Sequence, residues 1–283
     1  MHTALRFCWL AALAAAAAHS FAAPSPEERR AAMAALPWKQ GPTTGPLGDK
    51  ASMNVPKDAA LLGEDGSVKF MELTGNLPTP GYSIVAADGW FAAFSFNPVG
   101  YVKDDEKIHA DALLKDLKAQ DGPSNEERRK LGLPELTTEG WYVPPHYDPS
   151  TKHLEWGMKL RSGTDKEALI NYTVRLLGRT GYESVVLVSS PESLDADVRS
   201  FKTVLGGFNF NAGERYAEFK PGDRVAEFGL AALVAGGAAA VAAKTGLWKV
   251  VLGFLAASWK LVAAGAVALF VGIGKFFKSK NPQ

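Results

Sequence analysis

Hydrophobic and polar positions follow two different periods along this chain. Between residues 51 and 210, short runs with a two-residue period are separated by stretches in which apolar residues recur every three or four positions. The first period is typical of half-buried β-strands and the second of amphipathic helices. The predicted strands are 52–55, 59–62, 82–86, 90–96, 141–143, 153–160, 168–177, 184–189 and 208–210. The predicted helices are 24–37, 65–74, 108–119, 126–131 and 192–205.

The order of these elements predicts the fold class. Strands are joined by short turns, as at residues 87–89, and helices interrupt them without a regular strand–helix alternation. This order indicates an α+β domain in which an antiparallel sheet is flanked by helices, similar to an α/β/α sandwich. Within the strand at 90–96, Trp90 and Phe94 are expected on one face and Phe91 on the other.

Two segments show neither period. Residues 38–50 are rich in Gly, Pro and Thr, and we predict a flexible linker there. Residues 144–149 (PPHYDP) are predicted to form a loop stiffened by proline. The packed domain is therefore expected to span residues 51–224, preceded by a helix and linker over residues 24–50.

The first 23 residues have the order of features of a secretory signal peptide. Arg6 precedes an apolar run over residues 7–18, and small residues follow it. We predict that residues 1–23 are removed during export. Cys8, the single cysteine of the chain, lies in this segment. The mature chain would therefore have no disulfide, no cysteine nucleophile and no Cys-ligated zinc.

After residue 224 the sequence becomes strongly apolar, and we predict a transmembrane helix over residues 225–243. Its uncharged part, residues 228–243, would cover about 24 Å of a hydrocarbon core about 30 Å thick, which flanking residues or local thinning accommodate. Residues 244–283 hold a second apolar stretch with a central Lys260 and a basic end. This stretch is expected either to cross the membrane again or to lie on it. Small residues recur at every fourth position in both stretches, which either favours close helix packing and self-association or follows by chance from an Ala/Gly-rich composition.

The formal net charge of +1 conceals an uneven distribution. Residues 24–227 contain 24 Lys and Arg against 30 Asp and Glu, whereas residues 228–283 contain six Lys and no acid. A mildly acidic body without a basic stripe argues against nucleic-acid binding. Lysines beside the apolar stretches are typical of residues that flank membrane segments. The expected location is the bacterial inner membrane, with most of the chain in the periplasm.

Several strings of residues together resemble a known bacterial family. They include GYVKDDEK at 100–107, NEERRK at 125–130, PPHYD at 144–148, LEW at 154–156 and RYAEF at 215–219. With them the chain is similar to the domain of unknown function 2167 family, whose members are described as uncharacterised membrane-anchored proteins. The resemblance implies a bacterial envelope protein with C-terminal membrane helices, and it offers no catalytic residues. The order of elements is also similar to the α/β/α sandwich of the oxygen-evolving-complex P-subunit type, which implies a fold and no chemistry.

Acidic and imidazole side chains supply the candidate chemistry, because oxygen and imidazole ligands suit a divalent metal ion. The candidate metal ligands are Asp104, Asp105, His109, His146 and Asp148. The competing interpretation is structural. Acids at 104–106 would stabilise the N-terminus of the helix predicted at 108–119, and Tyr147 would close the edge of the sheet. The sequence contains no Gly-x-Ser-x-Gly elbow, phosphate-binding loop or His-Glu-x-x-His signature.

Two functions from different classes fit these observations. The leading hypothesis is a non-enzymatic envelope protein without a cofactor, whose exported domain mediates interaction or assembly. Its partners would be the lipid bilayer, another copy of the chain through the small-residue positions, or another envelope protein. The alternative is a membrane-bound enzyme, or a protein that binds a small ligand or a metal through the acidic and His-containing segments.

Overall fold

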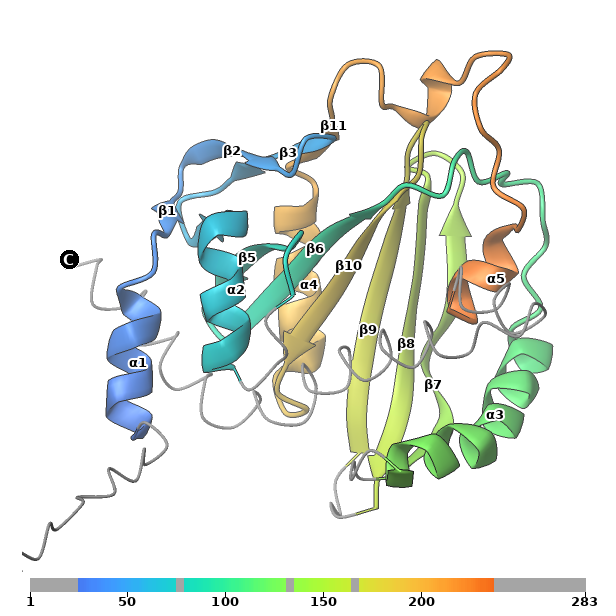
Figure 1. Cartoon of the computed structure of the whole chain (residues 1–283), viewed down its shortest axis with the longest axis horizontal. Coiled ribbons are helices and arrows are strands. Elements are labelled where there is room, and N and C mark those ends of the chain that lie inside the picture. Colours follow the sequence, from blue (N-terminus) through green and yellow to red (C-terminus); the bar gives the residue numbers. More distant parts are fainter. Residues whose placement is uncertain (1–24, 75–78, 131–134, 164–167, 237–283) are drawn as a thin grey trace, which may run out of the picture.

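An eight-stranded antiparallel sheet organises the fold (Figure 1). The computed structural model describes residues 25–74, 79–130, 135–163 and 168–236. The strands lie in the order β1-β4-β5-β6-β10-β9-β8-β7, and every neighbouring pair is antiparallel. They are β1 (Lys39–Gln40), β4 (Ala59–Leu62), β5 (Ser83–Ala87), β6 (Trp90–Asn97), β7 (Leu136–Asp148), β8 (His153–Ser162), β9 (Ala168–Leu177) and β10 (Tyr182–Ser189).

A smaller antiparallel sheet and helices surround the large one. The smaller sheet has the order β11-β3-β2. Its strands are β2 (Thr43–Leu47), β3 (Ala51–Val55) and β11 (Phe208–Phe210). The helices are α1 (Pro26–Ala34), α2 (Glu64–Leu73), α3 (Ala110–Lys130), α4 (Leu194–Leu205) and α5 (Leu230–Val234), with a 3₁₀ turn at Tyr216–Glu218. The prediction of an α+β fold with an antiparallel sheet flanked by helices is confirmed.

One face of the large sheet is covered by α4 and by the smaller sheet. Phe201 of α4 packs edge-on against Trp90 of β6, with ring centroids 5.7 Å apart. The Trp90 indole Nε1 donates a hydrogen bond to the Ser200 hydroxyl at 3.1 Å. Met53 of β3 is fully buried in the same apolar cluster. Burying these large side chains supplies much of the favourable free energy of folding on this face.

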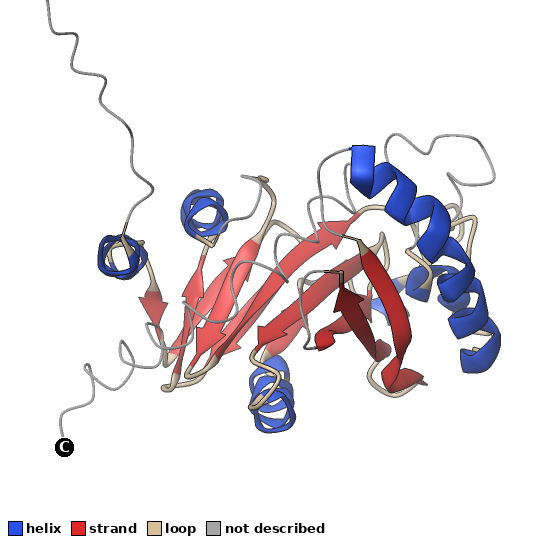
Figure 2. Cartoon of the chain, turned by 90° about the horizontal axis from the view of Figure 1, so that it is seen from below, coloured by secondary structure: helices blue, strands red, loops and turns tan. Residues whose placement is uncertain are grey.

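The opposite face is divided between two groups of helices. Figure 2 shows α1 and α2 on the side of the sheet away from α4. Phe70 of α2 packs edge-on against Phe91 of β6 at 4.9 Å, while Leu230 and Leu233 of α5 are buried beside Tyr182 of β10. Phe91 therefore faces α2 while its neighbour in sequence faces α4, which confirms the alternation predicted for this strand.

The segment at 38–50 was expected to be a linker, and that prediction is wrong. β1 pairs with β4, and β2 pairs with β3 over its whole length. Leu47 is buried, with 2% of its surface exposed. Gly45 and Pro46 interrupt the two-residue period, but an edge strand tolerates a proline because one side of its backbone makes no ladder bonds. The packed domain therefore begins before residue 51.

The two helices predicted at 108–119 and 126–131 form one helix of 21 residues, α3, with Pro123 inside it. Side chains on either side of the proline attach this helix to the edge strand. The Asp121 carboxylate accepts hydrogen bonds from one β7 residue, and the Asn125 amide bonds both backbone groups of another. These contacts fix the helix against β7 despite the donor that proline lacks.

The proline-rich segment predicted as a loop at 144–149 lies mostly within β7. This strand forms the edge of the sheet, and its register with β8 shifts at three places between residues 138 and 146. Proline is compatible with an edge strand, and register irregularities together with proline discourage pairing with another chain. The prediction of a loop is therefore wrong for residues 144–148, because pairing with β8 overrides the local composition.

The apolar C-terminal sequence starts as part of the packed domain. Residues 225–229 are not helical, and α5 has five residues with Leu230 and Leu233 buried, so the predicted start of a helix at 225 is wrong. Among the described residues, no helix is both long and apolar enough to cross a membrane. The rest of that prediction, the segment at 244–283 and the signal peptide at 1–23 lie outside the described residues.

Glu183 of β10 is a buried acid in this core. Only 2% of its surface is exposed, and its Oε2 has no hydrogen-bond partner among the residues that the structure describes. Burial raises its pKa to about 8, because desolvation disfavours the carboxylate, and Glu64 adds to this shift. The folded protein therefore holds a proton on Glu183 that the unfolded chain releases at much lower pH.

We expect the free energy of unfolding to fall as pH rises from about 4.5 towards 8, by at most about 1.4 kcal/mol per pH unit from this group. The Glu183→Gln variant has a neutral side chain at every pH, so its free energy of unfolding should not show this decline. Its stability relative to the wild type should therefore be greatest near pH 8. Urea unfolding of the full chain in detergent between pH 5 and 8 measures it. Glu192→Gln, at an exposed position, is the control. Parallel pH profiles for wild type and Glu183→Gln would contradict the assignment.

Candidate functional site

Asp104 is the centre of a polar cluster near the β7–β8 end of the sheet. Its Oδ2 accepts a hydrogen bond from the Tyr147 hydroxyl at 2.7 Å and from the Lys152 ammonium at 2.8 Å. Tyr147 belongs to β7, and Lys152 lies in the turn between β7 and β8. The Asp104 and Lys152 side chains are 25% and 32% exposed, so this is a partly buried ion pair.

The protonation states in this cluster are fixed by these contacts. Burial opposes ionisation of Asp104, but hydrogen bonds from Lys152 and Tyr147 outweigh it and hold the pKa of Asp104 below its ordinary value. Burial and the neighbouring carboxylate raise the pKa of Tyr147. At neutral pH the acid is charged and the phenol is protonated. Neither group is poised to exchange a proton, so the pair is poorly suited to general acid–base catalysis.

Aromatic rings continue the cluster. Tyr101 stacks on Tyr216, with centroids 4.4 Å apart, and lies 4.3 Å from the ring of Phe219. The Lys152 ammonium is 4.9 Å from the Tyr216 ring centroid, within reach of a cation–π interaction. The Tyr216 hydroxyl donates to the backbone carbonyl of Val102 at 2.9 Å. The rings of Tyr216 and Phe219 belong to the segment that leads to the C-terminus.

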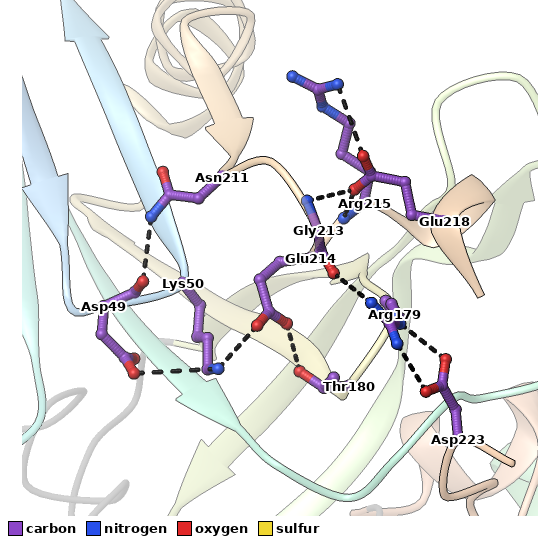
Figure 3. A network of polar contacts seen from close by, with 10 residues as sticks. All are labelled: Asp49, Lys50, Arg179, Thr180, Asn211, Gly213, Glu214, Arg215, Glu218 and Asp223. Atoms are coloured by element: carbon purple, nitrogen blue, oxygen red, sulfur yellow. Dashed lines mark hydrogen bonds and ion pairs between the residues drawn. The ribbon is translucent and has the colours of Figure 1, made fainter. Parts of the chain in front are cut away.

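That segment, residues 211–234, crosses the end of the sheet, and we call it the strap. Arg179, in the turn between β9 and β10, donates from Nε and Nη2 to the two carboxylate oxygens of Asp223, both at 2.7 Å (Figure 3). Its Nη1 donates to the Gly213 carbonyl at 3.1 Å. The Arg179 hydrogen bond lowers the pKa of Asp223 to about 2. A two-pronged contact of this kind fixes orientation as well as distance.

A second acid ties the strap to the smaller sheet. Glu214 accepts a hydrogen bond from the Lys50 ammonium at 2.7 Å and another from the Thr180 hydroxyl (Figure 3). The Asn211 amide donates to the backbone carbonyl of Asp49 at 3.0 Å. The strap is therefore bound to the β2–β3 turn and to the β9–β10 turn at once.

The strap also pairs with the backbone beside Asp104. The Tyr101 N–H donates to the Arg224 carbonyl at 2.8 Å, and the Ala226 N–H donates to the Tyr101 carbonyl at 2.9 Å. Gly100 has a φ of +94°, and a Cβ there would lie 2.7 Å from the Arg224 carbonyl oxygen. Glycine is therefore required for this close approach.

Of the three acids predicted to begin a helix, only Glu106 contacts a helix N-terminus, and that helix is a different one. α3 begins at Ala110, beyond the acidic run. Glu106 instead accepts a hydrogen bond from the Ala231 N–H in the first turn of α5, at 3.0 Å. A carboxylate is favourable at a helix N-terminus, because the first backbone N–H groups have no partner within the helix. The physical effect was predicted correctly, but its target was not.

The structure does not bring the five candidate metal ligands together. Asp104 is held by Lys152 and Tyr147, and Asp148 accepts hydrogen bonds from Ser150 within its own turn. The other three candidates are exposed: Asp105, His109 and His146. Over the described ranges, no group of three or more His, Cys, Asp or Glu side chains could hold a metal ion.

The sequence did not identify Lys152 and Arg179 as the partners of Asp104 and Asp223. Lys152 has a φ of 61°, which is uncommon for a residue other than glycine, and no sequence pattern signals it. Arg179 lies in the Gly178–Gly181 turn, which was predicted as a turn without a role for its side chain. An arginine in a compact turn between two strands is a weak signal for a contact with another segment.

The family model described as "Protein of unknown function (DUF2167)" matches residues 39–269. The chain belongs to this family. The match starts at the first residue of β1 and passes beyond α5, so both sheets and the strap lie within the DUF2167 region. A search of curated proteins gave no match. The solution structure of cyanobacterial PsbP (CyanoP) from Synechocystis sp. PCC 6803 is similar, with 9% identity and a TM-score of 0.35 over 60% of this chain and 92% of that chain.

Loss of the two-pronged contact should release the strap of this DUF2167 protein. Arg179→Lys keeps the charge but cannot bond both oxygens of Asp223, and Arg179→Gln removes the charge as well. We expect amide hydrogen exchange in residues 211–228 to become faster in the order wild type, Lys variant, Gln variant. Arg199→Lys, at an exposed position on α4, is the control. Unchanged exchange in both Arg179 variants would show that other contacts suffice to hold the strap.

The Asp104–Lys152 pair should contribute measurable stability. A double-mutant cycle with Asp104→Asn and Lys152→Met is expected to give a coupling free energy of about 1–2 kcal/mol, because the pair is partly buried and shares Tyr147. The exposed Lys69–Glu72 pair, with side chains 60% and 43% exposed, is the matched control and should give less than about 0.5 kcal/mol. Equal coupling in the two cycles would refute a special role for Asp104.

Proposed function

We propose that this DUF2167 protein is a non-enzymatic component of the bacterial envelope. Its α+β domain would be exported and held at the inner membrane by the apolar sequence after α5. There it would bind another envelope component or a second copy of the chain. The observation that carries the proposal is the way the strap fixes the point from which this apolar sequence departs.

The contacts of the strap support the idea that the domain is attached to the membrane in one fixed orientation. It is held by Arg179 at Asp223, by Tyr101 at residues 224–226 and by burial of Leu230 and Leu233. Only Ala235 and two glycines separate the buried end of α5 from the apolar sequence AAAVAA at 238–243. A membrane segment that begins here would hold the domain in one orientation, whereas a long Gly/Ser-rich linker would not.

The charge distribution supports the same proposal. The body is mildly acidic, and the lysines of residues 228–283 lie beside apolar stretches. Lys152 and Tyr147 both donate to Oδ2 of Asp104 and hold this carboxylate in place, which favours a structural role over a catalytic one. A domain with a fixed orientation and no assembled catalytic group in its described part is suited to binding a partner at the membrane surface.

Export can be tested by labelling a single cysteine. Lys57→Cys lies in an exposed turn, and Cys8→Ser removes the only natural thiol. In intact spheroplasts of a bacterial host, a membrane-impermeant maleimide should label this cysteine as fully as it does after lysis. A cytoplasmic thiol protein, labelled only after lysis, reports that the membrane is intact. Labelling of Lys57→Cys that requires lysis would place the domain in the cytoplasm and exclude the proposal.

The fixed tether can be tested by insertion. Ten Gly/Ser residues inserted after Ala235 should leave the domain folded but reduce crosslinking to its membrane partner, because the orientation is lost. The same insertion in the exposed turn at Lys57 and Asp58 is the control and should retain crosslinking. Equal crosslinking by both insertion variants would show that orientation is not required.

A further inference from the structure

Two exposed apolar side chains lie on the strap, on either side of the same tyrosine. In the described part of the chain, Phe219 and Val225 are the large apolar residues with more than a third of their surface exposed, at 38% and 37%. The Phe219 ring lies 4.3 Å from the ring of Tyr101, and Val225 is the bridge partner of Tyr101. Single exposed apolar residues are common on protein surfaces, but these two share a neighbour. We call Tyr101, Phe219 and Val225 the strap patch.

A tight turn separates the two apolar side chains. The Asp223 N–H donates to the Lys220 carbonyl at 3.0 Å, and the Asp223 carboxylate accepts a hydrogen bond from the Lys220 N–H at 2.7 Å. Pro221 and Gly222 occupy the central positions, and Gly222 has a φ of +96°. Proline followed by glycine in this conformation is typical of a type II turn. Both residues are exposed, so the tip of the strap is an ordered turn at the surface.

The charges beside this turn are positive, although the body as a whole is mildly acidic. Lys220 and Arg224 flank the turn and are exposed, and among the described residues neither makes an ion pair. The two acids between residues 215 and 226 are held by other contacts. Asp223 is bound by Arg179, and Glu218 accepts hydrogen bonds from the backbone N–H groups of residues 213 and 215. The strap patch is therefore bordered by exposed positive charge.

The strap patch lies close to the point at which the C-terminal apolar sequence leaves the domain. Tyr101 packs against the apolar cluster that buries the leucines of α5. Figure 1 shows the strap running along one side of the domain from the 3₁₀ turn to α5. The chain between Val225 and Gly236 includes α5 and spans at most about 30 Å. A bilayer that the chain enters after Gly236 is therefore within reach of the strap patch.

A lipid surface fits this patch better than a protein partner does. Stable protein interfaces bury about 800 Å² on each partner around an apolar centre, whereas the exposed apolar surface here belongs to parts of two side chains. At a membrane surface, apolar side chains enter the interface without a shaped partner, and basic side chains are attracted to anionic headgroups. A weak contact is sufficient, because a membrane segment after α5 would keep the domain at a high local concentration near the bilayer.

We propose that the strap patch rests on the bilayer surface as a second point of attachment. Its two apolar side chains enter the interface, and Lys220 and Arg224 lie against anionic lipid headgroups. This contact rests on the proposed function, because it requires the apolar sequence after α5 to enter the membrane. It adds to that function the face of the domain that is turned towards the lipid, which is the face that carries the strap.

Contact with lipid can be measured by fluorescence quenching. The full chain with Cys8→Ser and Pro221→Cys is labelled with a fluorophore at position 221 and reconstituted in liposomes that contain anionic lipid and a lipid with a nitroxide near its headgroup. The nitroxide should quench this label several-fold more strongly than the same label at Lys57→Cys, in an exposed turn between β3 and β4. Equal quenching at the two positions would overturn the contact.

Charge reversal tests the strap patch without changing a buried residue. Lys220→Glu combined with Arg224→Glu should reduce the quenching at position 221 to the level found at position 57, because anionic headgroups would then repel the turn. Lys39→Glu combined with Arg199→Glu makes the same change in net charge at other exposed positions and should leave the quenching as it is in the wild type. The same loss in both double variants would refute a specific role for the residues beside the turn.

Flotation of the same liposomes in a density gradient separates this contact from the proposed function. A chain that does not float with the liposomes is not anchored in the membrane, and both proposals are then wrong. A chain that floats without quenching at position 221 overturns the strap contact alone. A cysteine at 221 that is protected from maleimide in native membranes, yet is not quenched in liposomes, is covered by a protein, and the lipid contact is then wrong as well.

Discussion

The pairing of β10 with both β6 and β9 is the contact on which the rest of the structure depends. β10 joins the strands β1, β4, β5 and β6 to the strands β9, β8 and β7 of the large sheet. Val185, at its centre, lies opposite Phe94 on one side and Val174 on the other, and all three are buried. Because successive side chains point to opposite faces, a slip of one residue would move every apolar side chain of β10 to the wrong core.

The same pairing sets the position of the strap. The turn that connects β9 to β10 carries Arg179 and Thr180, which bind Asp223 and Glu214 of the strap. The strap ends in α5, whose buried leucines lie in the same apolar cluster as residues of β8, β9 and β10, apart from the cluster beneath α2. The central register thus determines where the C-terminal apolar sequence leaves the domain, although no residue of β10 itself is near that sequence in the chain.

Strands and helices with their own apolar period could be predicted from sequence, and elements defined by distant partners could not. β6 and α4 alternate or repeat clearly, and both were found close to their observed bounds. β2 is interrupted by Gly45 and Pro46, and α3 contains Pro123, so their local sequences favour breaks that pairing with β3 and β7 overrides. Asp104 was selected for its acidic neighbours, but its partners lie more than 40 residues later, which spacing alone cannot show.

Arg175 and Glu183 show how strand geometry determines whether two ionisable side chains of neighbouring strands can pair. They belong to neighbouring strands, and Glu183 lies opposite Leu176, the residue next to Arg175. Alternation sends the two side chains to opposite faces, so they cannot neutralise each other. Glu183 can resolve its burial by keeping a proton, which is why its pKa is raised to about 8. Arginine has no such route, because it stays protonated at any pH at which the protein is folded. Arg175 is only half-buried, so water can solvate part of its charge, whereas Glu183 is almost fully buried and keeps a proton instead.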